Sequence, residues 1–301
     1  MLMTVIPFLD AIDFTIASPD TALQMYEEGK LDWIGSPFSL IPTDAVRSLK
    51  SEGLLQVSPF FGTAFYRINT APSLNGIKNP LADPKVRRAL SLAIDRDGIV
   101  RSVLQGGQEA ARSLVPPQMG LRTERYVQKK KEELAENLDG PITISYLNSE
   151  RNAAVAQAIQ KQWENAFGIR VQLEAVEPKV FYQRVSKREY QIAGGSWTAD
   201  FNDPVNFLEV FKYKEGSANN TGWENLEFID FLNRSSVCSG GTERDELLQI
   251  AEAILLEEMP IIPIYHFALN FVKRPELSGV VLAPTGRLDL RRACFIAEGN
   301  R

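Results

Sequence analysis

Hydrophobic and polar positions along this chain follow two periods, one typical of helices and one typical of strands. The clearest helical pattern covers Thr242–Glu258, where Leu247, Ile250, Ala251 and Ile254 predict one buried face. Upstream of it, short apolar runs alternate with helical patterns. The expected strands are Ile142–Leu147, Ile169–Ala175 and Tyr190–Ala193, and the expected helices are Ala153–Phe167 and Val180–Ser186. This alternation predicts an α/β lobe whose strands pair at least partly in parallel.

Two Asp-Pro pairs mark further helix starts. Asp can cap the first turn, and proline at the first helical position loses no hydrogen bond. Asp83-Pro84 precedes apolar residues at helical spacing up to Ile94, and Asp203-Pro204 precedes Phe207-Leu208. We therefore expect one helix after each pair.

The pattern at the beginning of the chain predicts a strand, a helix and a second strand. Ile12, Phe14 and Ile16 alternate with polar or small residues, which predicts a strand with one buried face. A helix follows the Ser18–Thr21 cluster and closes at Gly29. Further expected elements are a strand at Leu31–Gly35, helices at Thr43–Ser51, Ile99–Leu104 and Tyr126–Leu138, and strands at Leu54–Pro59, Thr63–Asn69 and Ile261–Phe271.

Charge and hydropathy exclude several classes of partner. The 33 basic and 38 acidic residues give a net charge of −5, which argues against a nucleic-acid partner. No apolar run approaches the length of a membrane span, so we expect none. Asp10 and Asp13 interrupt the apolar N-terminal stretch, which has no basic start, so we expect no signal peptide in this chain. Whether Cys238 and Cys294 pair stays open.

Candidate catalytic groups are few. His266 is the only histidine, and its apolar surroundings in the sequence favour a buried structural residue over a metal ligand. No nucleophile elbow or phosphate-binding loop follows an expected strand. We therefore expect no catalysis, no cofactor and no metal.

The segment Gly194–Asp203 combines groups suited to ligand binding. Gly194-Gly195-Ser196 is expected to relax the backbone where a strand ends, leaving Trp197, Asp200 and Phe201 on a loop. Asp200 could accept a charge-assisted hydrogen bond from a ligand ammonium group. The alternative is that Asp200 only caps a turn and that Trp197 packs in the core.

Four stretches, in this order, resemble extracytoplasmic solute-binding family 5, the receptors of oligopeptide and dipeptide ABC importers. They are Tyr66–Thr70 followed by Asp83–Arg96, Gly106-Gly107 with Leu114–Pro117, Trp197–Pro204 with Phe207-Leu208, and Met259–Tyr265. The resemblance implies an α/β, periplasmic-binding-protein-like fold of the two-lobed class II type, N-terminally incomplete in this chain. Residues 1–66 would form part of the first lobe, 67–267 the second lobe, and 268–301 the return segment.

The same resemblance implies a peptide site. Asp200 would pair with the α-amino group of the ligand, and Ser196, Trp197 and Thr198 would line the pocket. Tyr66 and Phe267 would lie near the two lobe crossings and face the cleft. Family members can carry an arginine three residues before the pocket tryptophan, where a peptide carboxylate could be held, and Gly194 stands at that position here.

The implied function is capture of short peptides for the membrane permease subunits of an ABC importer. The chain would act as a monomer in the periplasm or cell envelope, without catalysis. Three alternatives stay open: the same fold binding another solute such as a nickel chelate, haem or a sugar, a shortened non-binding interaction module, and a peptide hydrolase.

Overall fold

A computed structural model of the chain describes residues 8–122 and 141–296. The helix expected over Tyr126–Leu138 lies outside these residues. The chain divides into two compact units, the first formed by 1–60, 104–108 and 267–301, the second by 61–103 and 109–266. The sequence placed the two crossings after residues 66 and 267 and did not separate 104–108 from its surroundings.

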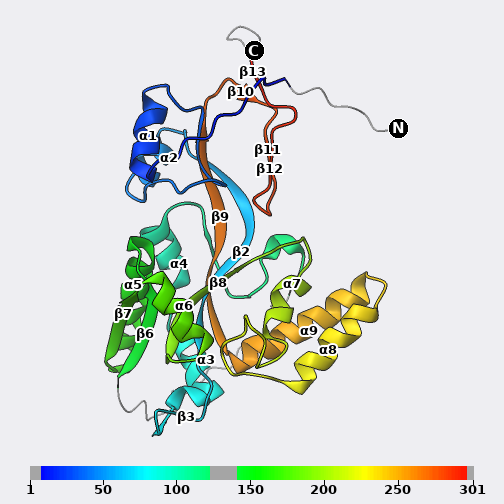
Figure 1. Cartoon of the computed structure of the whole chain (residues 1–301). Coiled ribbons are helices and arrows are strands. Elements are labelled where there is room, and N and C mark those ends of the chain that lie inside the picture. Colours follow the sequence, from blue (N-terminus) through cyan, green and yellow to red (C-terminus); the bar gives the residue numbers. More distant parts are fainter. Residues whose placement is uncertain (1–7, 123–140, 297–301) are drawn as a thin grey trace. The chain divides into compact units, whose positions relative to one another are not determined.

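The second unit contains β5, β6, β7, β8 and parts of β2 and β9, in the sheet order β9-β2-β8-β6-β7 with β5 also pairing with β9 (Figure 1). β2 pairs antiparallel with β8, whereas β6 pairs in parallel with both β7 and β8. The strands are β2 (Gln56–Ile68), β5 (Glu109–Ala110), β6 (Ile142–Leu147), β7 (Val171–Val176), β8 (Ile192–Thr198) and β9 (Ile261–Lys273). β2 was expected as two strands, yet its backbone stays extended without a turn.

Helices connect the parallel strands, which confirms the expected α/β alternation. α5 (Glu150–Phe167) joins β6 to β7, and α6 (Pro178–Ser186) joins β7 to β8. α5 begins earlier than expected because Ser149 caps it, its hydroxyl accepting a hydrogen bond from the Asn152 N–H. The helix ends at Gly168, whose φ of 67° lies in the left-handed region that favours glycine.

Both Asp-Pro pairs start helical turns as expected. The Asp83 carboxylate accepts a hydrogen bond from the Lys85 N–H at 2.8 Å and caps α3 (Pro84–Leu92). The Asp203 carboxylate accepts one from the Val205 N–H at 2.9 Å, at the start of α7 (Val205–Leu208). The next helix, α4 (Arg96–Ile99), is followed by one turn of π-helix, Val100–Leu104, where an α-helix was expected.

α9 (Thr242–Glu258) has the expected bounds but a different buried face. Leu248, Ala251 and Leu255 are fully buried, whereas Ile250 and Ile254 are only half-buried. The reason is packing on two sides, because α9 contacts both α3 and α8 (Leu226–Val237). The sequence reading missed α8, although the Asn225 side chain caps it by accepting from the Phe228 N–H.

The core of the second unit lies between α7, α8, α9 and one face of β2 and β8. Phe65, Phe207, Phe211, Phe228 and Leu255 are among its most buried members. A smaller cluster packs α6 against β7 and β8. Its members are Val176, Phe181, Val185, Tyr190 and Ala193.

The first unit contains α1 (Pro19–Glu27), β1 (Trp33–Gly35), α2 (Val46–Ser51) and three short hairpin or strand pairings. β1 pairs antiparallel with the end of β9, and Trp33 stacks on Phe271 with ring centroids 4.3 Å apart. Its remaining strands are β10 (Leu277–Ser278) with β13 (Cys294–Phe295) and β11 (Val281–Leu282) with β12 (Leu288–Asp289). Its core is formed by Ala22, Tyr26, Ile34, Ile41, Val46, Leu49 and Val272.

The strand expected at Ile12–Ile16 is wrong. These residues form no regular secondary structure, and Phe14 and Ile16 are 68% and 102% exposed. Alternation predicts a strand only if a neighbouring strand supplies hydrogen bonds, and no described strand pairs with this segment.

Candidate functional site

β8 carries most of the expected site, and it continues further than predicted. Gly194-Gly195-Ser196 does not end the strand, because β8 runs to Thr198 and pairs with β2 along its whole length. Ala199 extends this pairing, donating its N–H to the Phe61 carbonyl at 2.8 Å. The expected strand end at these glycines is therefore wrong, since pairing with β2 on both sides of them keeps the backbone extended.

The register divides the expected site residues between two faces of the sheet. Directly opposed residues of an antiparallel pair share a face. Tyr66 opposes Gly194, so it shares a face with Ser196 and Thr198. Trp197 points to the other face, where it packs against the main core cluster.

Asn206 joins Trp197 to Asp200. Its side-chain oxygen accepts hydrogen bonds from Trp197 Nε1 at 2.9 Å and from the Asp200 N–H at 3.2 Å. Its Nδ2 donates to the Asp200 carboxylate at 3.5 Å. Asn206 is buried in α7, and the sequence reading missed it. An asparagine among apolar helix residues was the available signal, because a buried amide requires partners.

Asp200, Ser196 and Thr198 are exposed, which leaves their side chains available to a ligand. Asp200 retains acceptor capacity, since a carboxylate offers about four lone-pair sites. Asn206 therefore holds the Asp200 backbone and carboxylate in place, and the carboxylate can still accept hydrogen bonds from a ligand.

Beyond Ala193, one edge of β8 has no neighbouring strand among the described residues. β6 pairs with β8 only at Ile192 and Ala193. Asn69 donates to the Gln191 carbonyl and Ala199 to the Phe61 carbonyl, so the odd-numbered residues of β8 bond to β2. The backbone groups of Ser196 and Thr198 consequently point to the open edge.

Arg67 reaches this edge from β2. It opposes Ala193, and its Nη1 donates to the Gly194 carbonyl at 3.4 Å. Its guanidinium also lies 5.0 Å from the centre of the Phe65 ring. Burial lowers the pKa of Arg67, with Tyr190 and Tyr182 opposing the shift. The sequence reading gave Arg67 no ligand role, although a charge within the apolar run Phe65–Ile68 was the available signal.

Unlike Asp200, Ser196 and Thr198, neither Tyr66 nor Phe267 is an exposed residue. Tyr66 is only 5% exposed, and this burial raises the pKa of its phenol. Its expected role facing a cleft stays a prediction. Phe267 belongs to the first unit, where its ring centroid lies 6.2 Å from that of Phe60.

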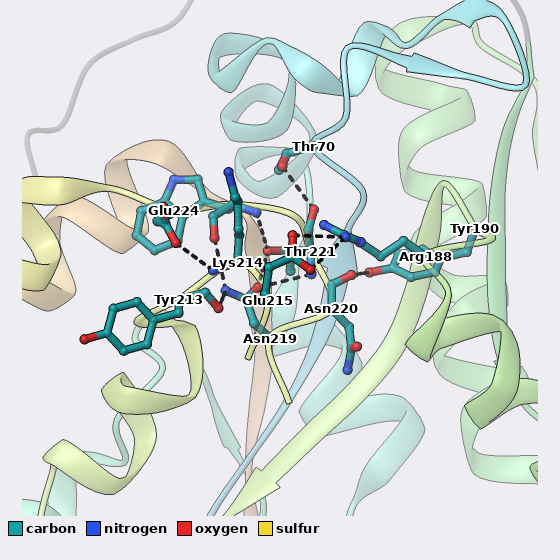
Figure 2. Close-up of polar contacts among 11 residues, drawn as sticks. Thr70, Arg188, Tyr190, Tyr213, Lys214, Glu215, Asn219, Asn220, Thr221 and Glu224 are labelled. Atoms are coloured by element: carbon teal, nitrogen blue, oxygen red, sulfur yellow. Dashed lines mark hydrogen bonds and ion pairs between the residues drawn. The ribbon is translucent and has the colours of Figure 1, made fainter. Parts of the chain in front are cut away.

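The loop that contains residues 213–224 is held by polar contacts to Thr70, Arg188 and Tyr190, as Figure 2 shows. Thr221 accepts hydrogen bonds at its carbonyl from both the N–H and the hydroxyl of Thr70. Tyr190 donates its hydroxyl to the Asn220 carbonyl at 2.5 Å, and Arg188 pairs with Glu215 at 3.3 Å. These contacts hold Tyr190, a neighbour of Arg67, in one position.

His266 is buried, as expected, and its environment is structural. Its Nδ1 lies 2.8 Å from the Thr63 hydroxyl, which donates to the Leu114 carbonyl at 2.7 Å. Among the described residues, no group of three or more His, Cys, Asp or Glu side chains could hold a metal ion.

Burial lowers the pKa of His266 from 6.5 to about 4, which predicts an acid-dependent loss of stability. Between these pH values the unfolded chain binds a proton that the folded chain does not, so stability falls as the pH drops. The loss attributable to His266 should reach about 3 kcal/mol near pH 4. Urea unfolding of wild type and His266→Asn at several pH values measures it. A constant difference between the two proteins across pH 4–7 contradicts the prediction.

Two further expectations concern cysteines and membranes. Cys238 and Cys294 are both free thiols in the structure. In the described part of the chain, no helix combines the length and apolar character needed to cross a bilayer.

Comparisons with known proteins place this geometry in a family. The family described as bacterial extracellular solute-binding proteins, family 5 Middle, matches residues 6–219. The chain is 37% identical to the oligopeptide-binding protein OppA of Bacillus subtilis, covering 93% of this chain and 54% of that protein. It is 26% identical to the dipeptide-binding protein DppE of the same organism, over 95% and 54% of the two chains. The chain thus spans about half the length of these relatives.

Solved structures give the same assignment for the fold. The unliganded open form of the periplasmic murein tripeptide-binding protein MppA matches with a TM-score of 0.75, covering 93% of this chain and 56% of that one at 24% identity. A periplasmic oligopeptide-binding protein from Borrelia burgdorferi matches with a TM-score of 0.74, over 92% and 56% of the chains at 26% identity. The expected periplasmic-binding-protein-like α/β fold is confirmed, and the chain belongs to the family 5 bacterial extracellular solute-binding proteins.

Proposed function

We propose that this chain binds short peptides as the capture component of an ABC importer, without catalysis. The observation that carries the proposal is the open edge of β8 beside the exposed carboxylate of Asp200. An extended peptide can add as a strand to such an edge, with main-chain hydrogen bonds supplying affinity whatever its side chains are. The backbone groups of Ser196 and Thr198 are the available partners.

Asp200 supplies the recognition of one peptide end. It follows directly after the open edge and is held by Asn206. A carboxylate placed there forms a charge-assisted hydrogen bond with a peptide α-ammonium group. Relatives named as oligopeptide- and dipeptide-binding proteins support the same ligand class. We infer a monomer in the periplasm or cell envelope that delivers peptides to membrane permease subunits.

Calorimetry with the purified chain and a mixture of di- to hexapeptides tests the proposal. We expect Asp200→Asn to weaken binding about ten- to hundredfold, because it removes one charge-assisted hydrogen bond. N-terminal acetylation of the peptides should weaken wild-type binding by a similar factor and leave the variant unaffected.

Asp44→Asn is the matched control, since Asp44 is an exposed carboxylate in the first unit. Binding by this control should equal that of wild type. The proposal fails if no peptide binds to the wild-type chain, or if Asp200→Asn binds as tightly as Asp44→Asn. Hydrolysis of a labelled peptide would instead indicate a peptidase.

A further inference from the structure

Arg67 is a cation without an anion. The Nε atom of its guanidinium is buried and has no hydrogen-bond partner, and the Gly194 carbonyl at 3.4 Å is a distant acceptor for Nη1. The ionisable neighbours that shift its pKa are tyrosines, and no described carboxylate forms an ion pair with it. Buried charges in proteins are normally paired, because removing an ion from water is costly.

Glycine at position 195 makes room for the Arg67 side chain. A Cβ atom on Gly195 would stand 2.0 Å from Arg67 Nη1 and 3.0 Å from the Phe65 ring. The guanidinium therefore occupies the space that any other residue at position 195 would fill. Gly194 differs, because the nearest atom to a Cβ there is Tyr146 Cβ at 3.7 Å.

This placement carries the guanidinium across β8. Arg67 starts on β2, passes over Gly195, and contacts the Gly194 carbonyl, which points away from β2. The side of β8 that it reaches is the open edge formed by Ser196 and Thr198. Arg67 and Asp200 thus lie toward opposite ends of that edge, one cationic and one anionic.

We propose that Arg67, whose side chain passes over Gly195, forms an anion subsite for a carboxylate of the bound ligand. The proposal rests on the proposed peptide-binding function and deepens it. A peptide main chain has opposite charges at its two ends, and the edge presents their complements in Asp200 and Arg67. The guanidinium fork matches a carboxylate in two parallel hydrogen bonds.

The first experiment compares di- to hexapeptides as free acids and as C-terminal amides. For at least one length we expect wild type to bind the acid about ten- to hundredfold more tightly. Arg67→Met should reduce this preference to near one, whereas Arg47→Met, which removes an exposed arginine of α2, should preserve it. A second pair of peptides has an amidated C-terminus and differs only in carrying glutamate or glutamine at one position. A preference for the glutamate peptide would show that the subsite binds a side-chain carboxylate and not the main-chain one. Equal binding within both pairs overturns the subsite while leaving peptide binding intact.

Glycine variants test the same subsite with its charge intact. Gly195→Ala should displace the guanidinium and abolish the acid preference, and Gly194→Ala should preserve it. If the two variants behave alike, the passage over Gly195 plays no part and the proposal is wrong.

Melting temperatures provide a readout that does not depend on peptide binding. Millimolar acetate should raise the melting temperature of wild type and of Arg47→Met but not of Arg67→Met. Without acetate, Arg67→Met should melt at or above the wild-type temperature, because it removes an uncompensated buried charge. An acetate response that is absent, or unchanged in Arg67→Met, contradicts the subsite even if no peptide binds.

Discussion

Replacing Arg87 with methionine is expected to lower the free energy of unfolding by about 4 kcal/mol. Arg87 is 2% exposed, and its guanidinium donates to four backbone carbonyls. Nη1 contacts those of Leu81 and Ala82, both at 2.8 Å, and Nε contacts those of Glu258 and Met259 at 2.8 and 3.1 Å. Methionine fills much of the same volume but leaves these carbonyls without a donor.

Two of these carbonyls lie at the C-terminal end of α9, which increases the loss of stability expected for Arg87→Met. Glu258 ends α9, where the unsatisfied carbonyls carry the negative end of the helix dipole, so a cation is favourable there. Burial lowers the pKa of Arg87 to about 10, which keeps it charged at neutral pH. Arg87 therefore connects the end of α9 to the start of α3.

Urea unfolding of Arg87→Met measures this loss. Lys85→Met on the same helix is the control, because Lys85 is exposed and should change stability by less than about 0.5 kcal/mol. Equal unfolding midpoints for the two variants would show that the guanidinium adds no net stability.

Glu252→Ala is expected to destabilise the second unit by about 3 kcal/mol. The Glu252 carboxylate is 1% exposed and accepts hydrogen bonds from the Leu114 N–H at 2.8 Å and the Val115 N–H at 2.7 Å. Both donors belong to buried residues. Alanine leaves two buried N–H groups unsatisfied, and each carries a desolvation penalty.

Glu252→Gln distinguishes the hydrogen bonds from the side-chain volume. Its amide oxygen can still accept, so we expect a loss of about 1 kcal/mol. Glu246→Ala, at an exposed position of the same helix, should be nearly neutral. Hydrogen exchange gives a local readout, because the Leu114 and Val115 amides should lose protection in Glu252→Ala. Unchanged protection of both amides refutes the assigned role.

Arg87 belongs to a sequence motif whose role the structure clarifies. The stretch Asp83–Arg96 contributed to the family resemblance, and its side chains are structural in the folded chain. Asp83 caps α3, Arg87 binds backbone carbonyls, and Arg96 donates to the carbonyls of Pro263 and Ser91. A local pattern could place the helix but not these acceptors, because Pro263 lies far along the chain.

In the candidate site, too, local sequence patterns identified some residues, whereas others depend on the tertiary structure. Asp200 and Trp197 were identifiable from their segment, since a carboxylate and an aromatic residue between a strand and a capped helix form a local pattern. Asn206 and Arg67 were not, because their roles depend on which atoms lie nearby. The two glycines were predicted to end a strand, whereas pairing with β2 keeps them inside β8. The missing side chain of Gly195 leaves space for the Arg67 guanidinium.

The sequence by itself determined the order and type of most elements, the helix starts at Asp83-Pro84 and Asp203-Pro204, and the family. These depend on residues close together in the chain, through side-chain periodicity and hydrogen bonds to neighbouring backbone. The tertiary structure alone decided that Ile12–Ile16 is not a strand, that α9 buries two sides, and that β8 has an open edge. It also decided that the Arg67 side chain passes over Gly195 and reaches the Gly194 carbonyl. Each of these depends on contacts between distant segments, and strand register and side-chain packing are set only when those segments meet.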